Sequence, residues 1–255
     1  MRIAIAQIPM HWEMRDNVAA MADALRVARD DGAAICAFAE LAVTGFHRRI
    51  VDWARPGRSG PAVAELCAAA ARLGVATVFG APTYRADGSR LNSHLFVDAT
   101  GAHVGTVSKN GLTAPEATFF APGVDRPTVT LAGLRCTAVI CREFEDAESI
   151  LPGLLDARPD VVFWPGQMRP DPAKPVQDPP EHVVAMQELA RRASVHVVQT
   201  NWPNALNRPE EGAQAGRSAC IGPDGTLLFR LPLQGFGVGV FDLGSSDVDW
   251  YPCDA

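Results

Sequence analysis

The chain has 255 residues, of which 47% are hydrophobic and 20% charged, and its formal net charge is −6. This composition is typical of a globular protein with a sizeable core, and it excludes a disordered or fibrous chain. Nucleic-acid binding is disfavoured because a phosphate-backbone binder needs a clustered basic face, whereas the basic pairs at residues 48–49 and 191–192 are isolated doublets.

Apolar strands alternate with amphipathic helices in the first third of the chain. Helices are recognised by apolar residues spaced three and four apart, and buried strands by short apolar runs. The predicted order is strand 2–8, helix 17–31, strand 33–39, helix 61–73 with Gly74 as its stop, and strand 75–80.

From residue 92 the pattern predicts strands joined by turns, and helices are predicted again from residue 145. The predicted elements are a hairpin over 92–108, a hairpin over 128–140, helix 145–155, strand 161–164, helix 182–193, strand 195–200 and a closing hairpin around 223–225. A proline-rich loop is expected over 165–180. This pattern predicts a layered α/β architecture with mixed sheets in a single domain over residues 1–255.

The amino end carries one basic residue and an apolar stretch too short for the centre of a signal peptide, and no apolar segment reaches the length of a membrane span. The six cysteines show no paired short spacing, which is typical of reduced thiols rather than of disulfides or a zinc site. The histidines share no ligand spacing either. We therefore expect a cytoplasmic protein with no membrane span, no metal and no cofactor.

Three chemically versatile side chains stand where apolar strands end. These are Glu40, Lys109 and Cys141. Active sites of α/β proteins assemble at strand ends. A thiolate can act as a nucleophile, a carboxylate can move its proton, and an ammonium can stabilise an oxyanion. Taken singly, each residue has an ordinary alternative, as a buried packing cysteine or a strand-end charge.

Three segments resemble, in order and spacing, the signature blocks of the nitrilase superfamily, the carbon–nitrogen hydrolases. They are residues 38–46 (FAELAVTGF), 109–123 (KNGLTAPEATFFAPG) and 138–144 (AVICREF). The later segments 216–218 and 223–225 are similar to the family's closing hairpin, so the resemblance covers nearly the whole chain. It implies a four-layer α-β-β-α sandwich. Three blocks in the right order form a far more specific signal than any one of them alone.

The resemblance also implies roles for individual residues. Glu40 is expected to be the general base and acid, Lys109 the stabiliser of the oxyanion and Cys141 the nucleophile. Glu116, seven residues after the lysine, matches a second glutamate that positions substrate and the other members. The backbone amide of Arg142 is expected to complete the oxyanion site.

Several positions depart from the family pattern. Phe46 stands where members commonly have Tyr, and Gly111 stands where they have His. Residues 143–147 stand where members commonly have an Asp–x–Arg–Phe–Pro run. Glu148 matches the family at a position that is usually acidic, and it is expected to support the structure. The triad positions are unaffected, so these departures bear on the substrate rather than on the chemistry.

Pocket residues are expected in the loop after strand 161–164 and among the residues after Glu40, where Phe46 lies. Trp164, Gln167 and the pair Met168–Arg169 lie where the resemblance places the pocket wall, and Arg169 is a candidate anchor for an acidic substrate group. Asn201 and Trp202, at the end of the next strand, are weaker candidates of the same kind. For each of these the alternative is ordinary packing or a solvated surface position.

The predicted function is hydrolysis of a carbon–nitrogen bond in a small carboxamide through a thioester, with release of ammonia or an amine. A nitrilase or an N-carbamoyl amidohydrolase is the alternative within the family, and Arg142 disfavours a nitrilase, which usually has an aromatic residue there. A catalytically silent structural or regulatory member is the alternative of another class. The expected partners are a small amide, carbamoyl or nitrile substrate and a second copy of the chain, in a homodimer or larger homo-oligomer.

Overall fold

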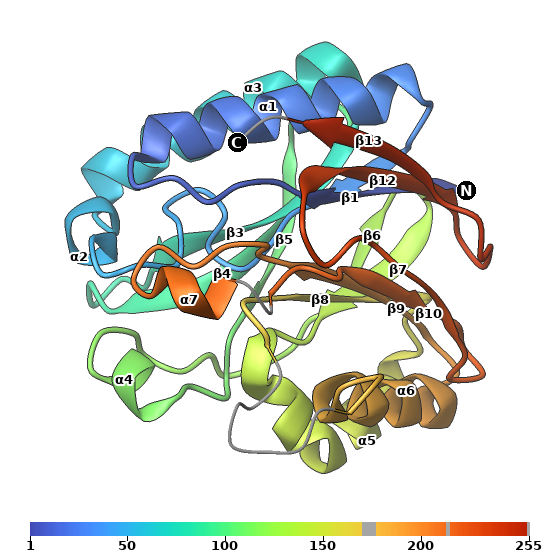
Figure 1. The fold of residues 1–255 in the computed structure, drawn as a ribbon. Helices are drawn as coiled ribbons and strands as arrows, with labels where there is room; N and C mark the ends of the chain where they lie inside the picture. The colour runs from blue at the N-terminus through green and yellow to red at the C-terminus, as the bar shows by residue number, and fades with distance from the viewer. Residues whose placement is uncertain (170–176, 213–214, 254–255) are drawn as a thin grey trace.

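Two β-sheets packed face to face form the centre of the molecule, and helices cover both outer faces (Figure 1). The computed structural model describes residues 1–169, 177–212 and 215–253. In the first sheet the strand order is β13 (Asp249–Cys253), β12 (Phe236–Asp242), β1 (Arg2–Gln7), β2 (Ile35–Ala37), β3 (Ala76–Tyr84), β4 (Arg90–Val97) and β5 (His103–Ser108). In the second sheet it is β11 (Leu227–Arg230), β10 (Ala219–Ile221), β9 (His196–Asn201), β8 (Val161–Gly166), β7 (Leu134–Ala138) and β6 (Val129–Leu131).

Three neighbouring strands at the centre of each sheet run parallel, and the flanking strands pair antiparallel. The parallel sets are β1–β2–β3 and β7–β8–β9. The long outer helices are α1 (Met14–Asp30) and α3 (Pro56–Leu73) over the first sheet, and α5 (Ala147–Ala157) and α6 (Glu181–Ala193) over the second. The α-β-β-α sandwich with mixed sheets is therefore confirmed.

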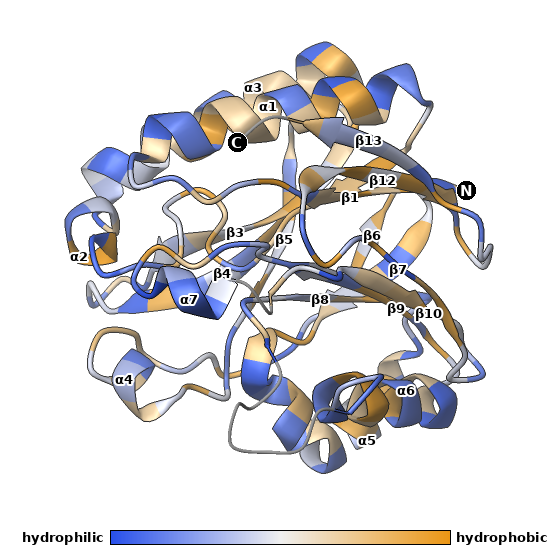
Figure 2. Cartoon of the chain, in the orientation of Figure 1, coloured by the Kyte–Doolittle hydropathy of each residue, from blue (hydrophilic) through white to orange (hydrophobic). Residues whose placement is uncertain are grey.

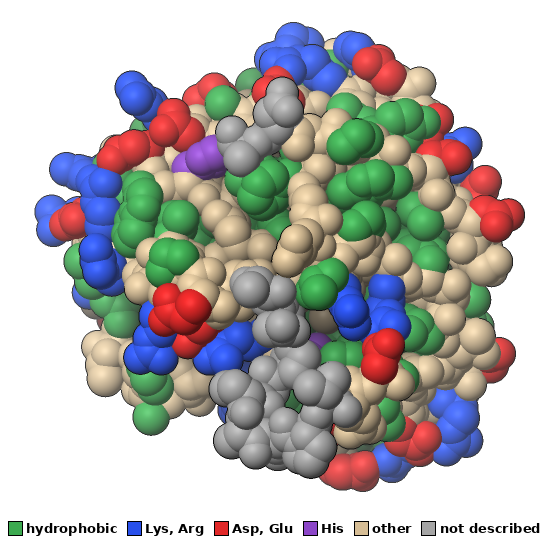
Figure 3. Space-filling model, in the orientation of Figure 1, with side chains coloured by type: hydrophobic (Ala, Val, Ile, Leu, Met, Phe, Trp, Pro, Cys, Tyr) green, Lys and Arg blue, Asp and Glu red, His purple; other side chains and the backbone are tan. Residues whose placement is uncertain are grey.

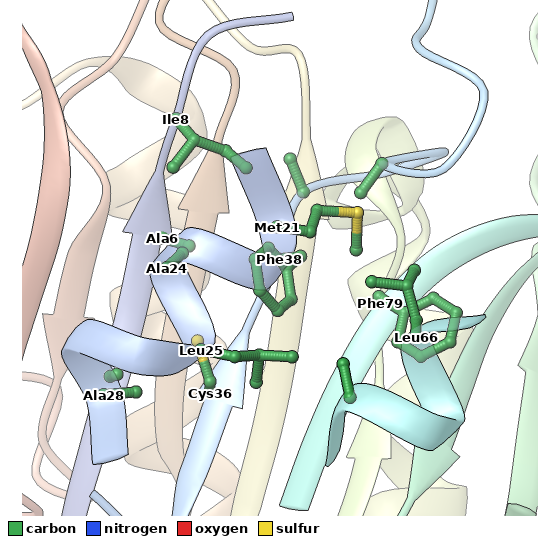
Figure 4. Packing of buried hydrophobic residues seen from close by; sticks show 14 of the residues in the cluster. Ala6, Ile8, Met21, Ala24, Leu25, Ala28, Cys36, Phe38, Leu66 and Phe79 are labelled. Atoms are coloured by element: carbon green, nitrogen blue, oxygen red, sulfur yellow. The ribbon is translucent and has the colours of Figure 1, made fainter. Parts of the chain in front are cut away.

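The apolar residues of the central strands are divided between three core layers. In β1, Ile3 and Ile5 pack between the sheets, whereas Ala4 and Ala6 face the helices that cover the first sheet. Figure 4 shows the outer layer, where Met21 of α1 lies beside Phe38. Because both faces of these strands are covered, most of their residues are apolar, and Figure 2 shows orange along much of their length.

Helix α3 differs from its prediction because it begins at Pro56, five residues before the expected start. Pro56 is tolerated in the first helical turn, where its missing N–H has no acceptor in the helix. The hydroxyl of Ser59 donates to the carbonyl of Arg55 across this first turn. Among the described residues, no helix has the length and apolar character needed to cross a membrane.

The last two strands were not predicted. β12 returns to the first sheet and pairs with β1 along its whole length, from Arg2 opposite Asp242 to Gln7 opposite Gly237. β13 then closes the edge of this sheet. Its segment is mostly exposed and contains Pro252, so it lacks the alternation that identifies a strand from sequence.

Candidate active site

The three residues expected to form the triad lie at strand ends that meet between the two sheets. Lys109 directly follows β5, and Glu40 comes three residues after β2. Cys141 comes three residues after β7 and opens the short 3₁₀ helix η1 (Cys141–Asp146). The charges of Glu40 and Lys109 both act on the Cys141 thiol. The fold thus brings together residues separated by up to 101 positions in sequence.

A fully buried ammonium is the centre of this cluster. Lys109 Nζ donates to Glu40 Oε1 at 2.8 Å and to Glu116 Oε1 at 2.7 Å. The side chains of Lys109 and Glu40 have no exposed surface, and that of Glu116 is 7% exposed. Burying a single carboxylate is costly, and the shared ammonium offsets that cost for both.

The two oxygens of Glu40 differ in their surroundings. Oε1 accepts from Lys109 and, at 2.7 Å, from the side-chain amide of Asn92 on β4. Oε2 is buried and has no hydrogen-bond partner among the described residues. Because a buried acceptor without a donor is unfavourable, this oxygen is the available site for a proton.

Glu116 is fixed by the short helix α4 (Ala114–Ala117). Thr113 caps this helix: the Glu116 N–H donates to its hydroxyl, while its own N–H donates to Glu116 Oε2 at 2.8 Å. This capping box occupies Oε2 and leaves Oε1 for Lys109. The segment TAPE at residues 113–116 therefore encodes the orientation of the second glutamate.

The backbone of Cys141 is held in an unusual conformation. Its φ is +52°, a region that residues other than glycine rarely adopt. The indole N–H of Trp164 donates to the Cys141 carbonyl at 3.0 Å. The backbone N–H of Gln167 points at the sulfur and favours the thiolate. Both residues come from the end of β8, so this strand determines how the thiol is presented.

Burial controls the protonation of the cluster. Burial and the charge of Glu40 raise the pKa of Cys141 to about 12, and Lys109 lowers it only in part. Burial also raises the pKa of Glu40, against the effect of the nearby Lys109 ammonium. For Lys109, burial favours the neutral amine, but the charges of Glu40, Cys141 and Glu116 outweigh it and raise the pKa. At neutral pH the cluster therefore holds a thiol and an ammonium.

The backbone of Glu40 is held as firmly as its side chain. The indole N–H of Trp202 donates to the Glu40 carbonyl at 2.8 Å, and Leu41 has a φ of +52°. Gly80 of β3 packs against this turn so closely that an added Cβ would lie 2.0 Å from the Leu41 nitrogen. Trp202, expected in the pocket wall, thus supports Glu40 from behind.

Glu143 joins the cysteine segment to the lysine segment. Its fully buried carboxylate accepts from the backbone N–H groups of Asn110 at 2.7 Å and Gly111 at 3.1 Å, and from Ile140 at 2.6 Å. The guanidinium of Arg126 pairs with it at 3.0 Å. One carboxylate two residues after Cys141 therefore fixes the chain directly after Lys109. We did not single it out from the sequence, although it is the first acidic residue after the cysteine.

Two departures from the family pattern are explained together. Arg142 forms ion pairs with Glu145 and Asp146 on η1. A Cβ added to Gly111 would lie 2.1 Å from Asp146 Oδ2 and 3.1 Å from the Arg142 guanidinium. The space that a larger residue would need at position 111 is therefore occupied by this charged cluster.

The other expected pocket residues are engaged in core packing, a hydrogen bond or an ion pair. Phe46 is half-buried and packs against the core layer below α1 and α3. Trp164 is fully buried, and the side chain of Gln167 donates to the carbonyl of Asn204 at 3.0 Å. Arg169 pairs with Glu211 at 2.8 Å, so its charge is already compensated.

Three further residues have defined places. Arg142 is the second residue of η1, where backbone N–H groups lack an acceptor within the helix. Glu148 on α5 is exposed and pairs with Arg192 on α6, so it links the two helices. Asn92 was not predicted as a site residue, because its amide is one of several polar side chains in the first half of β4. Across the described ranges, no group of three His, Cys, Asp or Glu side chains is arranged to hold a metal ion.

Comparison with known proteins identifies the family. The model of the carbon–nitrogen hydrolase family matches residues 2–252. The chain therefore belongs to the carbon–nitrogen hydrolases, and the resemblance seen in the sequence is confirmed. No curated protein sequence matches it.

Solved structures of an amidase from Nesterenkonia sp. share the fold. One superposes with a TM-score of 0.82 at 22% identity, covering 95% of this chain and 90% of the other. A mutant of that amidase in complex with butyramide gives the same values. A double mutant in complex with acrylamide superposes with a TM-score of 0.83 at 21% identity, covering 97% and 92% of the two chains.

Proposed function

We propose that this carbon–nitrogen hydrolase is an amidase in which Cys141 is the nucleophile, Glu40 the general base and acid, and Lys109 the oxyanion stabiliser. The observation that carries the proposal is the buried Lys109 ammonium, held between the carboxylates of Glu40 and Glu116 and acting on the Cys141 thiol. An ion pair on the surface has no comparable effect on a nucleophile, because water screens it.

The acylation half begins from a thiol, because the pKa of Cys141 is raised to about 12. The sulfur attacks the amide carbon while its proton passes to Glu40, whose Oε2 has no other partner in the described structure. The oxyanion that forms is stabilised by Lys109 and by the backbone N–H of Arg142. Glu40 then returns the proton to the nitrogen, the carbon–nitrogen bond breaks, and ammonia leaves behind a thioester on Cys141.

The deacylation half uses the same groups. Glu40 takes a proton from water, and the hydroxide attacks the thioester carbon. The oxyanion that forms in this step is stabilised by the same donors, the Lys109 ammonium and the backbone N–H of Arg142. When it collapses, the carbon–sulfur bond breaks, the carboxylic acid leaves, and Glu40 returns the proton to the thiolate. One amide and one water thus give one acid and one ammonia.

Glu116 acts through Lys109 and is therefore a positioning residue. It fixes the ammonium at 2.7 Å from its Oε1, and the capping box around Thr113 fixes Glu116 in turn. Small aliphatic amides are the first substrates to test, since butyramide and acrylamide bind the Nesterenkonia amidase mutants of the same fold.

The experiment is ammonia release from a panel of primary amides, carbamoyl compounds and nitriles. The wild-type protein is compared with Cys141→Ala and with Cys67→Ala, a matched control on α3 that removes a half-buried thiol elsewhere. We expect release from amides that disappears in Cys141→Ala and persists in Cys67→Ala. Activity confined to nitriles or to carbamoyl compounds would replace the amidase proposal by one of those activities.

A trapping experiment tests the intermediate. In Glu40→Gln, no carboxylate is available to activate water, so an acyl group that reaches Cys141 is expected to accumulate and to add the acyl mass to the peptide with residues 136–142. A protein that is inactive on the whole panel and forms no adduct at Cys141 would instead be a catalytically silent member of the family.

A further inference from the structure

A groove lined by arginines, the arginine groove, opens at the end of the first sheet where β3 and β4 meet. Its volume is about 630 Å³, which lies in the usual range for small-molecule sites. Arg55, Arg85 and Arg90 supply its positive charge, and its lining contains no Asp or Glu. The lining also contains no residue of the candidate active site, so the two are separate places on the molecule.

The three guanidinium groups are not neutralised by acidic partners. Within the described structure none of them forms an ion pair. Arg90 stacks on the ring of Phe119, with 3.9 Å between the guanidinium carbon and the ring centroid, and Arg85 donates to the carbonyl of Pro122 at 2.6 Å. Because a guanidinium has five N–H donors, both side chains retain donors for an anion.

The nearest acid in sequence does not cancel this charge. Asp87 feels the charge of Arg85, but its carboxylate accepts from the backbone and hydroxyl of Ser89 within its own turn. Arginine side chains suit a phosphate group, because their fork donates two parallel hydrogen bonds to its oxygens. The polar part of the groove therefore fits a phosphate.

The remaining wall of the groove is apolar and aromatic. It is formed by Val51, Ala54 and Pro56 together with the rings of Tyr84 and Phe119. Val51 is 49% exposed, so part of this apolar surface faces solvent. A phosphate ion alone would leave this wall uncovered. The groove thus suits a phosphate that carries a planar, weakly polar group, and a nucleobase is such a group.

Additional basic residues surround the groove. Arg49 and Arg58 both stack on Trp53 of α2 (Ile50–Trp53), directly before the groove residue Ala54. Figure 3 shows basic side chains gathered at the side of the molecule where α2 lies. Although the whole chain is acidic, with a net charge of −6, this edge is positively charged and would attract anions from solution.

The groove is joined to the segment that carries Glu116. The N–H of Phe119 donates to the carbonyl of Glu116 at 2.9 Å, and the N–H of Ala121 donates to the carbonyl of Arg90 at 2.7 Å. The carboxylate of Glu116 in turn holds the Lys109 ammonium. An anion that draws the arginine side chains towards itself would therefore act on the segment that fixes Glu116.

We propose that the arginine groove is a regulatory site for a nucleoside monophosphate. The three arginines bind the phosphate, and the base lies against the apolar wall. Binding draws Arg85 away from the Pro122 carbonyl and Arg90 away from the Phe119 ring. This loosens the segment after α4 and lowers the rate of the proposed amidase without occupying its site. The binding itself does not depend on the proposed function, whereas the effect on the rate does.

Binding is measured by calorimetry on the wild-type protein with AMP, adenosine and ribose 5-phosphate. AMP should bind at least about tenfold more tightly than either of the others, because it alone meets both the arginines and the apolar wall. Equal affinity for adenosine would contradict the role of the arginines. Equal affinity for ribose 5-phosphate would contradict recognition of a base.

Substitutions locate the bound nucleotide. In Arg85→Gln and Arg90→Gln the Kd for AMP should rise about tenfold, as expected for the loss of one charge-assisted hydrogen bond. Arg72→Gln, which removes an exposed arginine at the other end of α3, is the matched control and should retain the wild-type Kd. Cys141→Ala should retain it too. Absence of AMP binding, or equal Kd values in Arg90→Gln and Arg72→Gln, would overturn the proposal.

The regulatory effect is tested with an amide that the wild type hydrolyses. Saturating AMP should lower kcat about fivefold and leave KM unchanged, and the same AMP concentration should have less effect on Arg90→Gln. An unchanged kcat would contradict the regulatory role, and a raised KM alone would place AMP at Cys141 and contradict the groove. If no amide is hydrolysed, the amidase proposal fails, and the binding measurements still decide whether the groove binds the nucleotide.

Discussion

Replacing Glu143 by Gln should destabilise the protein and at the same time displace Lys109, the proposed oxyanion stabiliser. The carboxylate is fully buried, accepts three backbone hydrogen bonds and neutralises Arg126, which is itself only 13% exposed. Removing one partner of a buried ion pair costs about 3–5 kcal/mol, and the new amide N–H₂ would face a donor on at least one side. For a chain of this size that corresponds to a fall in Tm of about 6–20 °C.

The expected effect on activity follows from the position of Glu143 between the segments that carry Lys109 and Cys141. It binds the backbone directly after Lys109 and lies two residues after Cys141. A shift of about 1 Å between the reacting groups lowers the rate about 100-fold, so we expect a loss of this size in kcat/KM with butyramide at a temperature where circular dichroism shows a folded protein. Thermal unfolding and initial rates are the two assays.

Glu145→Gln is the matched control for this prediction. It is the same substitution two residues later, at an exposed side chain that pairs with Arg142. Its effect on stability should stay below about 1 kcal/mol. If Glu143→Gln had the same Tm and the same kcat/KM as Glu145→Gln, the conclusion that Glu143 fixes the segments of Lys109 and Cys141 would be refuted.

Two further predictions concern the candidate site directly. Burial raises the pKa of Glu40 above its usual value near 4.5, so kcat/KM of the wild type should rise with pH through a midpoint above 4.5. The negative charge of Glu116 also raises this pKa. Glu116→Gln removes that charge and should therefore move the midpoint to lower pH. A pH–rate profile that left the midpoint in place would contradict this coupling. Trp164→Phe removes the hydrogen bond to the Cys141 carbonyl and should lower kcat about fivefold, equivalent to about 1 kcal/mol, whereas an unchanged kcat would show that this bond does not orient the thiol.

The sequence predicted the layers of the fold better than its edges. The central strands are apolar on both faces, and their helices carry a clear apolar stripe, so local pattern was enough. β12 is different because its place beside β1 depends on pairing between residues 230 to 240 positions apart. β13 is short and mostly exposed, and its place at the edge of the sheet is determined by β12 rather than by its own residues.

In the candidate site too, residues in distinctive sequence segments were predicted, whereas residues that act through tertiary contacts were not. The triad and Glu116 were named from sequence because each stands in a distinctive local segment. The partners that hold them were not, because Asn92 and Glu143 act through contacts between different strand ends. Trp164 and Trp202 were expected in the pocket wall, but their indole groups donate to the carbonyls of Cys141 and Glu40. Sequence position placed them near the site, and only the fold shows which way they point.

The space at Gly111 offers a test of whether the departures from the family pattern depend on each other. In Gly111→Ala the new Cβ would lie 2.1 Å from Asp146 Oδ2, a distance that forces the carboxylate or the backbone to move. Overpacking of this kind typically costs about 1–3 kcal/mol, and here it also strains the segment directly after Lys109, so both Tm and kcat/KM should fall. Truncating the obstacle in Gly111→Ala/Asp146→Ala should restore most of both losses. Asp146→Ala alone, which removes a surface ion pair with Arg142, should have an effect below about 1 kcal/mol. Simple addition of the two single effects in the double variant would mean that Gly111 and Asp146 are independent, and that the absence of a larger side chain at position 111 has another cause.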